Sequence, residues 1–151
     1  MTPPYENASA QFSRGPILLV EDNPADVDLM KRAFSKRGIT RPLIVARDGE
    51  EALACIQEWE ADSDSIPALI LLDLKLPKVS GLAVLRQIKH HPKFRTIPVV
   101  MLTTSDQDSD VHAAYDLGAN SYIVKPINFE KFLEAIGNIE QYWLALNFNA
   151  N

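Results

Sequence analysis

Short apolar runs alternate along the chain with longer segments whose apolar residues recur at helical spacing. The runs are too short for helices, and proline, glycine or polar residues bound them, which is typical of strands buried inside a sheet. They predict strands at residues 16–20, 42–46, 67–72, 97–102 and 120–124. The other segments predict helices at residues 24–37, 49–59, 82–90, 107–117 and 128–143.

Helix start and stop signals support these boundaries. Asn23 precedes Pro24, and proline is favoured in the first turn of a helix because its missing N–H needs no partner there. Gly38 is placed to end the same helix. Asp48 and Glu51 stand three positions apart, which predicts a capping box for the next helix.

The regular alternation of strand and helix predicts an α/β fold. Connections of βαβ length imply a five-stranded parallel sheet with five helices and right-handed crossovers. We expect the flavodoxin-like, doubly wound strand order 2-1-3-4-5. In that order the first and third strands are neighbours, and a crevice opens at their carboxyl ends.

Length and composition fit one domain with terminal extensions. The 151 residues, 16.8 kDa, are enough to bury a substantial core. We expect the domain at residues 16–140. Residues 1–15, with two prolines and small polar residues, predict a disordered or loosely docked arm, and residues 141–151 predict an aromatic extension of the last helix.

Charge and cysteine content exclude several classes of protein. The net charge of −5 argues against a nucleic-acid partner, because such binding needs a basic face. No apolar run approaches the roughly 18 residues of a membrane span, and no signal-peptide pattern begins the chain. The single cysteine, Cys55, excludes an internal disulfide. We therefore expect a cytoplasmic protein with no membrane or nucleic-acid partner.

Polar residues gather where the predicted strands end. Glu21 and Asp22 follow the first strand, Asp73 the third, Thr103 the fourth and Lys125 the fifth. Two carboxylates about 4 Å apart repel by a few kcal/mol at an effective dielectric near 20, so a cation must offset the repulsion. Mg²⁺ suits such a site because it needs few carboxylates and keeps waters for a phosphate. The pattern predicts a phosphoryl-transfer site with a carboxylate nucleophile.

From about residue 16 to residue 139 the chain resembles the receiver domain of two-component response regulators. The motifs that carry the resemblance are Val20-Glu21-Asp22-Asn23, Leu71-Leu72-Asp73-Leu74-Lys75-Leu76-Pro77, Gly81, Leu102-Thr103-Thr104-Ser105 and Ser121-Tyr122-Ile123-Val124-Lys125-Pro126. Each motif is weak alone, but together they mark the ends of the expected strands. The resemblance implies a single-domain phosphoacceptor protein, not an ordinary enzyme, which promotes its own phosphorylation and dephosphorylation.

The resemblance also implies roles for these residues. Asp73 would be the phosphoacceptor. Asp22, Asp73 and the backbone carbonyl of Lys75 would bind Mg²⁺, and Glu21 would act through water. Thr103 and Lys125 would contact the phosphoryl group. Tyr122 would be an aromatic switch that rotates when Thr103 moves, and Lys125-Pro126 would be a cis peptide.

Partners follow from the same resemblance. The phosphoryl donor would be a sensor histidine kinase, and a switched protein-interaction face would bind an unknown downstream protein. The aromatic stretch 141–148, with Ser121-Tyr122 and Thr103-Thr104, resembles the small response regulators of cyanobacterial phytochromes, which tend to dimerise. This implies a phytochrome kinase and a homodimer that depends on Trp143 and Phe148. The alternative, in which the tail folds back on the core, stays open.

Three other classes of protein share parts of this pattern. A pseudo-receiver would keep the fold as a constitutive interaction scaffold, and the sequence leaves it open. A haloacid-dehalogenase-type phosphatase needs a second aspartate two positions after the first, where this chain has Lys75. A flavodoxin-type cofactor binder needs a glycine run after the first strand, where this chain reads Glu21-Asp22-Asn23-Pro24.

Overall fold

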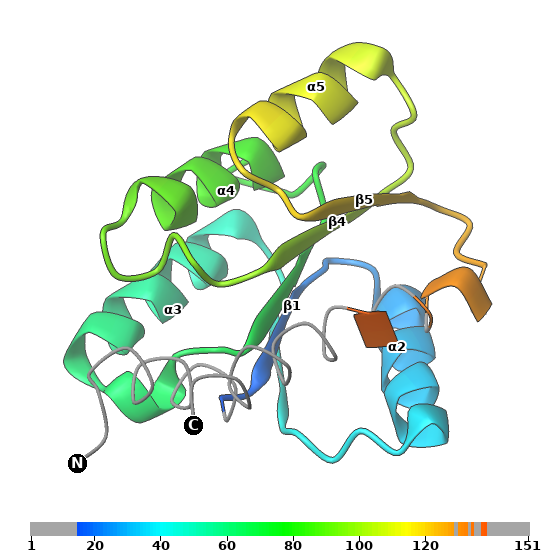
Figure 1. Ribbon diagram of the computed structural model, residues 1–151, viewed down its shortest axis with the longest axis horizontal. Helices are drawn as coiled ribbons and strands as arrows, with labels where there is room; N and C mark the ends of the chain where they lie inside the picture. The colour runs from blue at the N-terminus through cyan, green and yellow to red at the C-terminus, as the bar shows by residue number, and fades with distance from the viewer. Residues whose placement is uncertain (1–14, 129, 133, 135–136, 139–151) are drawn as a thin grey trace.

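Five parallel strands form one sheet in a computed structural model that describes residues 15–128, 130–132, 134 and 137–138 (Figure 1). The strands are β1 (Ile17–Val20), β2 (Leu43–Ala46), β3 (Leu69–Leu72), β4 (Val99–Thr103) and β5 (Ser121–Val124). Their order is β2-β1-β3-β4-β5, and every neighbouring pair is parallel. The predicted fold class and strand order are confirmed.

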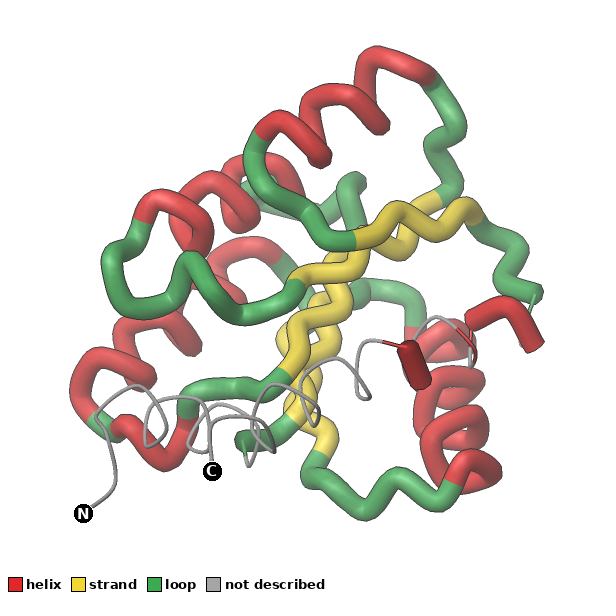
Figure 2. Tube along the Cα trace, viewed as in Figure 1, coloured by secondary structure: helices red, strands yellow, loops and turns green. Residues whose placement is uncertain are grey.

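Helices cover both faces of this sheet. They are α2 (Pro24–Arg37), α3 (Gly49–Ala61), α4 (Gly81–His90) and α5 (Asp108–Asp116), with a short 3-10 turn η1 (Ser63–Ser65) after α3. Residues 130–132, 134 and 137–138 are also helical, at the position of the fifth predicted helix. In Figure 2 the yellow strands run through the centre, with α2 on one side and α3 and α4 on the other.

The predicted helix caps are present, with one change. The Asn23 side chain accepts a hydrogen bond from the Ala25 N–H at 2.9 Å, and Gly38 ends α2 with φ of 78°. The Asp48 side chain accepts from the Glu51 N–H at 2.9 Å. The Glu51 carboxylate, however, accepts from the N–H of Arg47 and not from that of the cap residue. The box therefore extends one residue further back than the sequence pattern predicts.

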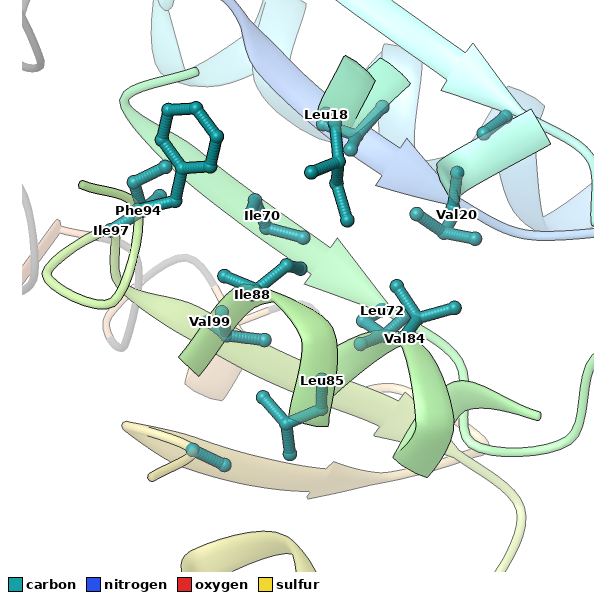
Figure 3. Packing of buried hydrophobic residues seen from close by; sticks show 14 of the residues in the cluster. Leu18, Val20, Ile70, Leu72, Val84, Leu85, Ile88, Phe94, Ile97 and Val99 are labelled. Carbon is teal, nitrogen blue, oxygen red and sulfur yellow. The ribbon is translucent and has the colours of Figure 1, made fainter. Parts of the chain in front are cut away.

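Two apolar clusters hold the layers together. One lies between the sheet and α3, α4 and α5, where Leu18, Ile70 and Val99 pack against Val84, Leu85 and Ile88, as Figure 3 shows. The other lies under α2, where Met30 and Phe34 meet Phe132 beneath Leu19 and Leu71. Strand residues alternate between the two clusters because successive side chains point to opposite faces. The three inner strands are therefore apolar except for the buried Thr103 at the end of β4, as strands covered on both faces require.

Terminal predictions fall mostly outside the described residues. The expected arm lies there except for Gly15, which is buried, and the expected aromatic extension at 141–151 lies there entirely. Within the described part, no helix is long and apolar enough to cross a bilayer.

Candidate functional site at the carboxyl edge of the sheet

The acidic cluster forms at the carboxyl edge because β1 and β3 are adjacent and in register. Val20 pairs with Leu72, and the Asp73 N–H donates to the Val20 carbonyl at 3.1 Å. Asp73 therefore lies beside Glu21 and Asp22. Carboxylate oxygens from these three residues lie within 4.8 Å of one another. Glu21 and Asp73 are buried, at 2% and 7% exposed, whereas Asp22 faces solvent.

Lys125 closes the cluster from the end of β5. Its Nζ donates to Glu21 Oε1, to Asp26 Oδ2 at 2.8 Å and to Asp73 Oδ2 at 3.2 Å. Only 10% of the side chain is exposed, so this ammonium group is held in place by its three acceptors. The peptide bond from Lys125 to Pro126 is cis, as the resemblance implies.

Asp26 was not predicted as a site residue. It lies in the first turn of α2, four positions after Asp22, and it shares Lys125 with Glu21 and Asp73. An acidic residue in the first helical turn after the Glu21-Asp22 pair is the signal that could have identified it. With Asp26 included, four carboxylates lie at this edge, and three of them pair with the ammonium group of Lys125.

Burial and neighbouring charges shift the pKa values of Glu21 and Lys125 in this cluster. Burial raises the pKa of Glu21 to about 7, and the charge of Asp73 adds to this, although the hydrogen bond from Lys125 opposes it. The opposing effect is limited because one ammonium group serves three carboxylates. Burial alone would lower the pKa of Lys125, but hydrogen bonds to Asp26 and Glu21 and the charge of Asp73 raise it above its usual range. Lys125 is therefore charged.

The carboxylates fit a hard divalent cation. Such ions prefer oxygen ligands, and the excess negative charge at this edge favours a cation over an anion. The residues able to hold it are Asp22 and Asp73, with Glu21 close by. The predicted ligand Lys75 follows in the next loop, where its backbone N–H donates to Asp73 Oδ1 at 3.2 Å.

Thr103 and Tyr122 meet at the loop after β4. Thr103 is fully buried at the end of β4, and its Oγ1 accepts from the Ser105 N–H at 3.3 Å. The Tyr122 hydroxyl donates to the Ser105 carbonyl at 2.8 Å. Ser105 in turn donates from Oγ to Asp110 Oδ2 at 2.5 Å. Ser105 thus links the two residues; the sequence identified it as part of the motif at Thr103, but its bridging contact and the partner Asp110 were not predicted.

The loop after Asp73 depends on one glycine. A Cβ added at Gly81 would lie 2.0 Å from the Asp73 carbonyl oxygen, so a larger residue would displace the backbone of the site. The Gly81 N–H donates to the Leu74 carbonyl at 2.8 Å. In the same loop Lys78 forms ion pairs with Asp48 at 3.4 Å and Glu50 at 3.5 Å, which join the loop to the start of α3.

These observations place the chain in a structural class: a doubly wound α/β protein with an acidic cluster at the carboxyl ends of its first and third strands, closed by a lysine. Residues 17–137 match the family model of the response regulator receiver domain, and the chain belongs to this family. As a receiver domain it is a phosphoacceptor signalling protein. Receiver domains bind a divalent metal ion and take the phosphoryl group from histidine kinases.

Several relatives cover most of the chain. A probable methanogenesis regulatory protein, FilR2 of Methanothrix harundinacea, is 47% identical over 87% of this chain and 84% of its own. Response regulator Rcp1 of Synechocystis is 43% identical over 85% of this chain and 88% of its own, and its Mn²⁺-bound crystal structure has a TM-score of 0.72. The phosphorylated cyanobacterial phytochrome response regulator RcpA is 40% identical, with a TM-score of 0.74 over 88% of this chain and 96% of that one. The predicted resemblance to phytochrome-linked response regulators is confirmed.

Proposed function

We propose that this protein accepts a phosphoryl group on Asp73 from a sensor histidine kinase in an Mg²⁺-dependent reaction and thereby switches a protein-interaction face. The observation that supports this most is the pairing of Lys125 with Asp73 beside Glu21 and Asp22 at the carboxyl edge of the sheet. A carboxylate nucleophile, a fixed positive charge and a cation site are the parts that phosphoryl transfer to a side chain requires.

Asp22 and Asp73 would hold Mg²⁺ with the backbone carbonyl of Lys75, and Glu21 would act through a water molecule. When bound, the ion would neutralise charge on the phosphoryl oxygens. Asp73 is suited to the nucleophilic role because it is nearly buried yet lies at the crevice, with one oxygen held by Lys125 and the other by the Lys75 N–H.

In the transfer step, a carboxylate oxygen of Asp73 attacks the phosphorus of the kinase phosphohistidine. A phosphorus–oxygen bond forms as the phosphorus–nitrogen bond breaks, and the imidazole nitrogen leaves with the electron pair. Lys125 turns from the Asp73 carboxylate to a phosphoryl oxygen, and the Thr103 hydroxyl donates a hydrogen bond to another. The Thr103 hydroxyl oxygen now accepts from the Ser105 N–H. Movement of Thr103 toward the phosphoryl group would therefore also move the loop whose Ser105 carbonyl binds Tyr122.

The similarity to known response regulators and the exposed residues near β5 support the proposed partners of this protein. RcpA, to which this chain is 40% identical, is a cyanobacterial phytochrome response regulator, and this supports a phytochrome-type kinase as the donor. Tyr115 on α5 and Val124 on β5 are 48% and 39% exposed, which supports an interaction face on these elements. We include in the proposal a homodimer through this face, a downstream protein partner and a cytoplasmic location.

The test is phosphorylation by acetyl phosphate or a phosphorylated kinase, with and without Mg²⁺, followed by intact mass measurement. The wild type should gain one phosphoryl group in the presence of Mg²⁺, and hydroxylamine should remove it because it is an acyl phosphate. Asp73→Asn should gain none. The matched control is Asp28→Asn, because Asp28 is an exposed aspartate on α2 and should not affect labelling.

Two outcomes would contradict the proposal. Equal labelling of wild type and Asp73→Asn would exclude Asp73 as the acceptor. No labelling of the wild type under any donor and metal condition would favour the pseudo-receiver alternative, in which the fold serves as a scaffold.

A further inference from the structure

An apolar pocket lies at the edge of the sheet opposite the acidic cluster. Its volume is about 370 Å³, and its walls include Leu18, Ile44, Cys55 and Trp59 with the prolines that precede β1, β2 and β3. Ile44 is 45% exposed although it lies on a strand. Two carboxylates, Glu58 and Asp64, also line the pocket. An apolar surface with an acidic border at this position has no part in phosphoryl transfer.

The first described residues, Gly15 and Pro16, lie beside this pocket. Gly15 is buried so tightly that an added Cβ would lie 1.9 Å from the Ile66 carbonyl oxygen. Its own carbonyl accepts a hydrogen bond from Arg41 Nη1 at 2.9 Å. The next residue, Pro16, lines the pocket and accepts from the Ala68 N–H at 2.8 Å. The point from which residues 1–14 continue is therefore fixed beside the opening.

We propose that the N-terminal arm docks here, with the Phe12 side chain in the pocket. Phe12 precedes Pro16 by four residues, a stretch that spans at most about 14 Å, so its ring is within reach of the pocket. Arg14 lies between them and has a charge opposite to that of Glu58 and Asp64. An aromatic ring against Ile44 and Trp59 would cover apolar surface that is otherwise open to water.

Cys55 provides a direct probe of occupancy. It is the only cysteine of the chain and lines the pocket, so the rate at which a thiol reagent modifies the protein reports access to this wall. We expect Phe12→Ala to increase the rate by on the order of tenfold, because burial of an aromatic side chain shifts a docking equilibrium by about that factor or more. Tyr5→Ala, the matched change in the same arm, should leave the rate unchanged.

Ionisation must be separated from access. Burial and the nearby charge of Glu58 raise the pKa of Cys55, so rates are compared at several pH values and with the fully unfolded chain. Thermal unfolding of each variant checks that the domain is intact. Phe12→Leu, which keeps an apolar side chain, should restore most of the protection.

Three results would overturn the proposal. The first is a wild-type rate in Phe12→Ala. The second is a faster rate in Trp143→Ala with Phe148→Ala but not in Phe12→Ala, which would make the C-terminal aromatic residues the occupant. The third is protection that disappears on dilution, which would make a second copy of the chain the occupant. Phosphorylation at Asp73 does not enter any of these measurements, so the proposed function and this one fail independently.

Discussion

Replacing Lys125 with methionine tests whether this ammonium group holds the acidic cluster together. The side chain is 10% exposed, and its Nζ donates to Glu21, to Asp26 at 2.8 Å and to Asp73 at 3.2 Å. Methionine keeps most of the length and apolar stem of lysine but removes the charge. The carboxylates would then face one another without a cation.

The cost can be worked from the geometry. At the 4.8 Å limit within which Glu21, Asp22 and Asp73 lie, each pair of full charges repels by about 3 kcal/mol at an effective dielectric of 20. Protonation of Glu21, whose pKa is already raised to about 7, would relieve part of this repulsion. Removal of one partner from a buried ion pair typically costs about 3–5 kcal/mol. We therefore expect Lys125→Met to lower the free energy of unfolding by about 3 kcal/mol without metal.

The assay is urea unfolding followed by circular dichroism, with a chelator and then with Mg²⁺. The matched control is Lys78→Met, since Lys78 also contacts two carboxylates but is 56% exposed, and solvent-exposed ion pairs contribute little to stability. Mg²⁺ should reduce the difference in free energy of unfolding between Lys125→Met and wild type, because the ion replaces the lost positive charge. If Lys125→Met is as stable as Lys78→Met in the chelator, the electrostatic reasoning is wrong.

Three further predictions concern the metal, pH and assembly. Asp22→Ala should weaken Mg²⁺ binding in calorimetry while raising the stability of the metal-free protein, because it removes one repelling carboxylate; unchanged affinity would misplace the metal site. Burial lowers the pKa of Lys89 to about 8, so between that value and its usual 10.5 the unfolded chain binds more protons. Stability should therefore rise with pH across this window, and Lys89→Met should flatten the rise in chemical unfolding. Sedimentation should show a dimer for the wild type and weaker dimerisation for the double variant Trp143→Ala, Phe148→Ala. Adding a phosphoryl donor should change the dimer affinity of the wild type. If both proteins are monomers in every condition, residues 141–148 do not form a dimer interface.

The sequence predicts the elements of the fold well because local and long-range requirements agree there. A strand covered on both faces must be almost entirely apolar, and the one polar residue of β1, β3 and β4 is Thr103, at the end of β4. The observed strand boundaries differ from the predicted ones where a turn or a side chain takes the place of a backbone hydrogen bond between strands. Residues 97 and 98 lie before β4, since the Ile97 N–H donates to Phe94 in a turn and Pro98 has no N–H. Asn120 lies outside β5, and its side chain instead accepts from the Val99 N–H at 2.9 Å.

The candidate site was predicted less completely, for a physical reason. Strand order brings Glu21, Asp22 and Asp73 to one edge, so their proximity follows from the fold. The direction of the Lys125 side chain does not follow from the fold alone. It depends on the packing of β5 against β4 and on where α2 places Asp26, which are long-range features without a local pattern. The roles of these residues in phosphoryl transfer remain predictions.

The contacts of Lys125 provide a route by which the acidic cluster and the proposed interaction face could be coupled. Its backbone N–H donates to the Thr103 carbonyl at 2.7 Å, while its side chain holds Asp73. Three residues earlier, on β5, Tyr122 donates to the Ser105 carbonyl in the loop that follows Thr103. Val124, which is 39% exposed, lies between them on the outer surface of β5. A phosphoryl group on Asp73 that draws Lys125 and Thr103 toward it would therefore affect both the Tyr122 contact and the exposed surface at Val124. Packed elements change between discrete conformations. Phosphorylation would therefore shift the populations of two conformations with different surfaces, and would not deform one surface gradually.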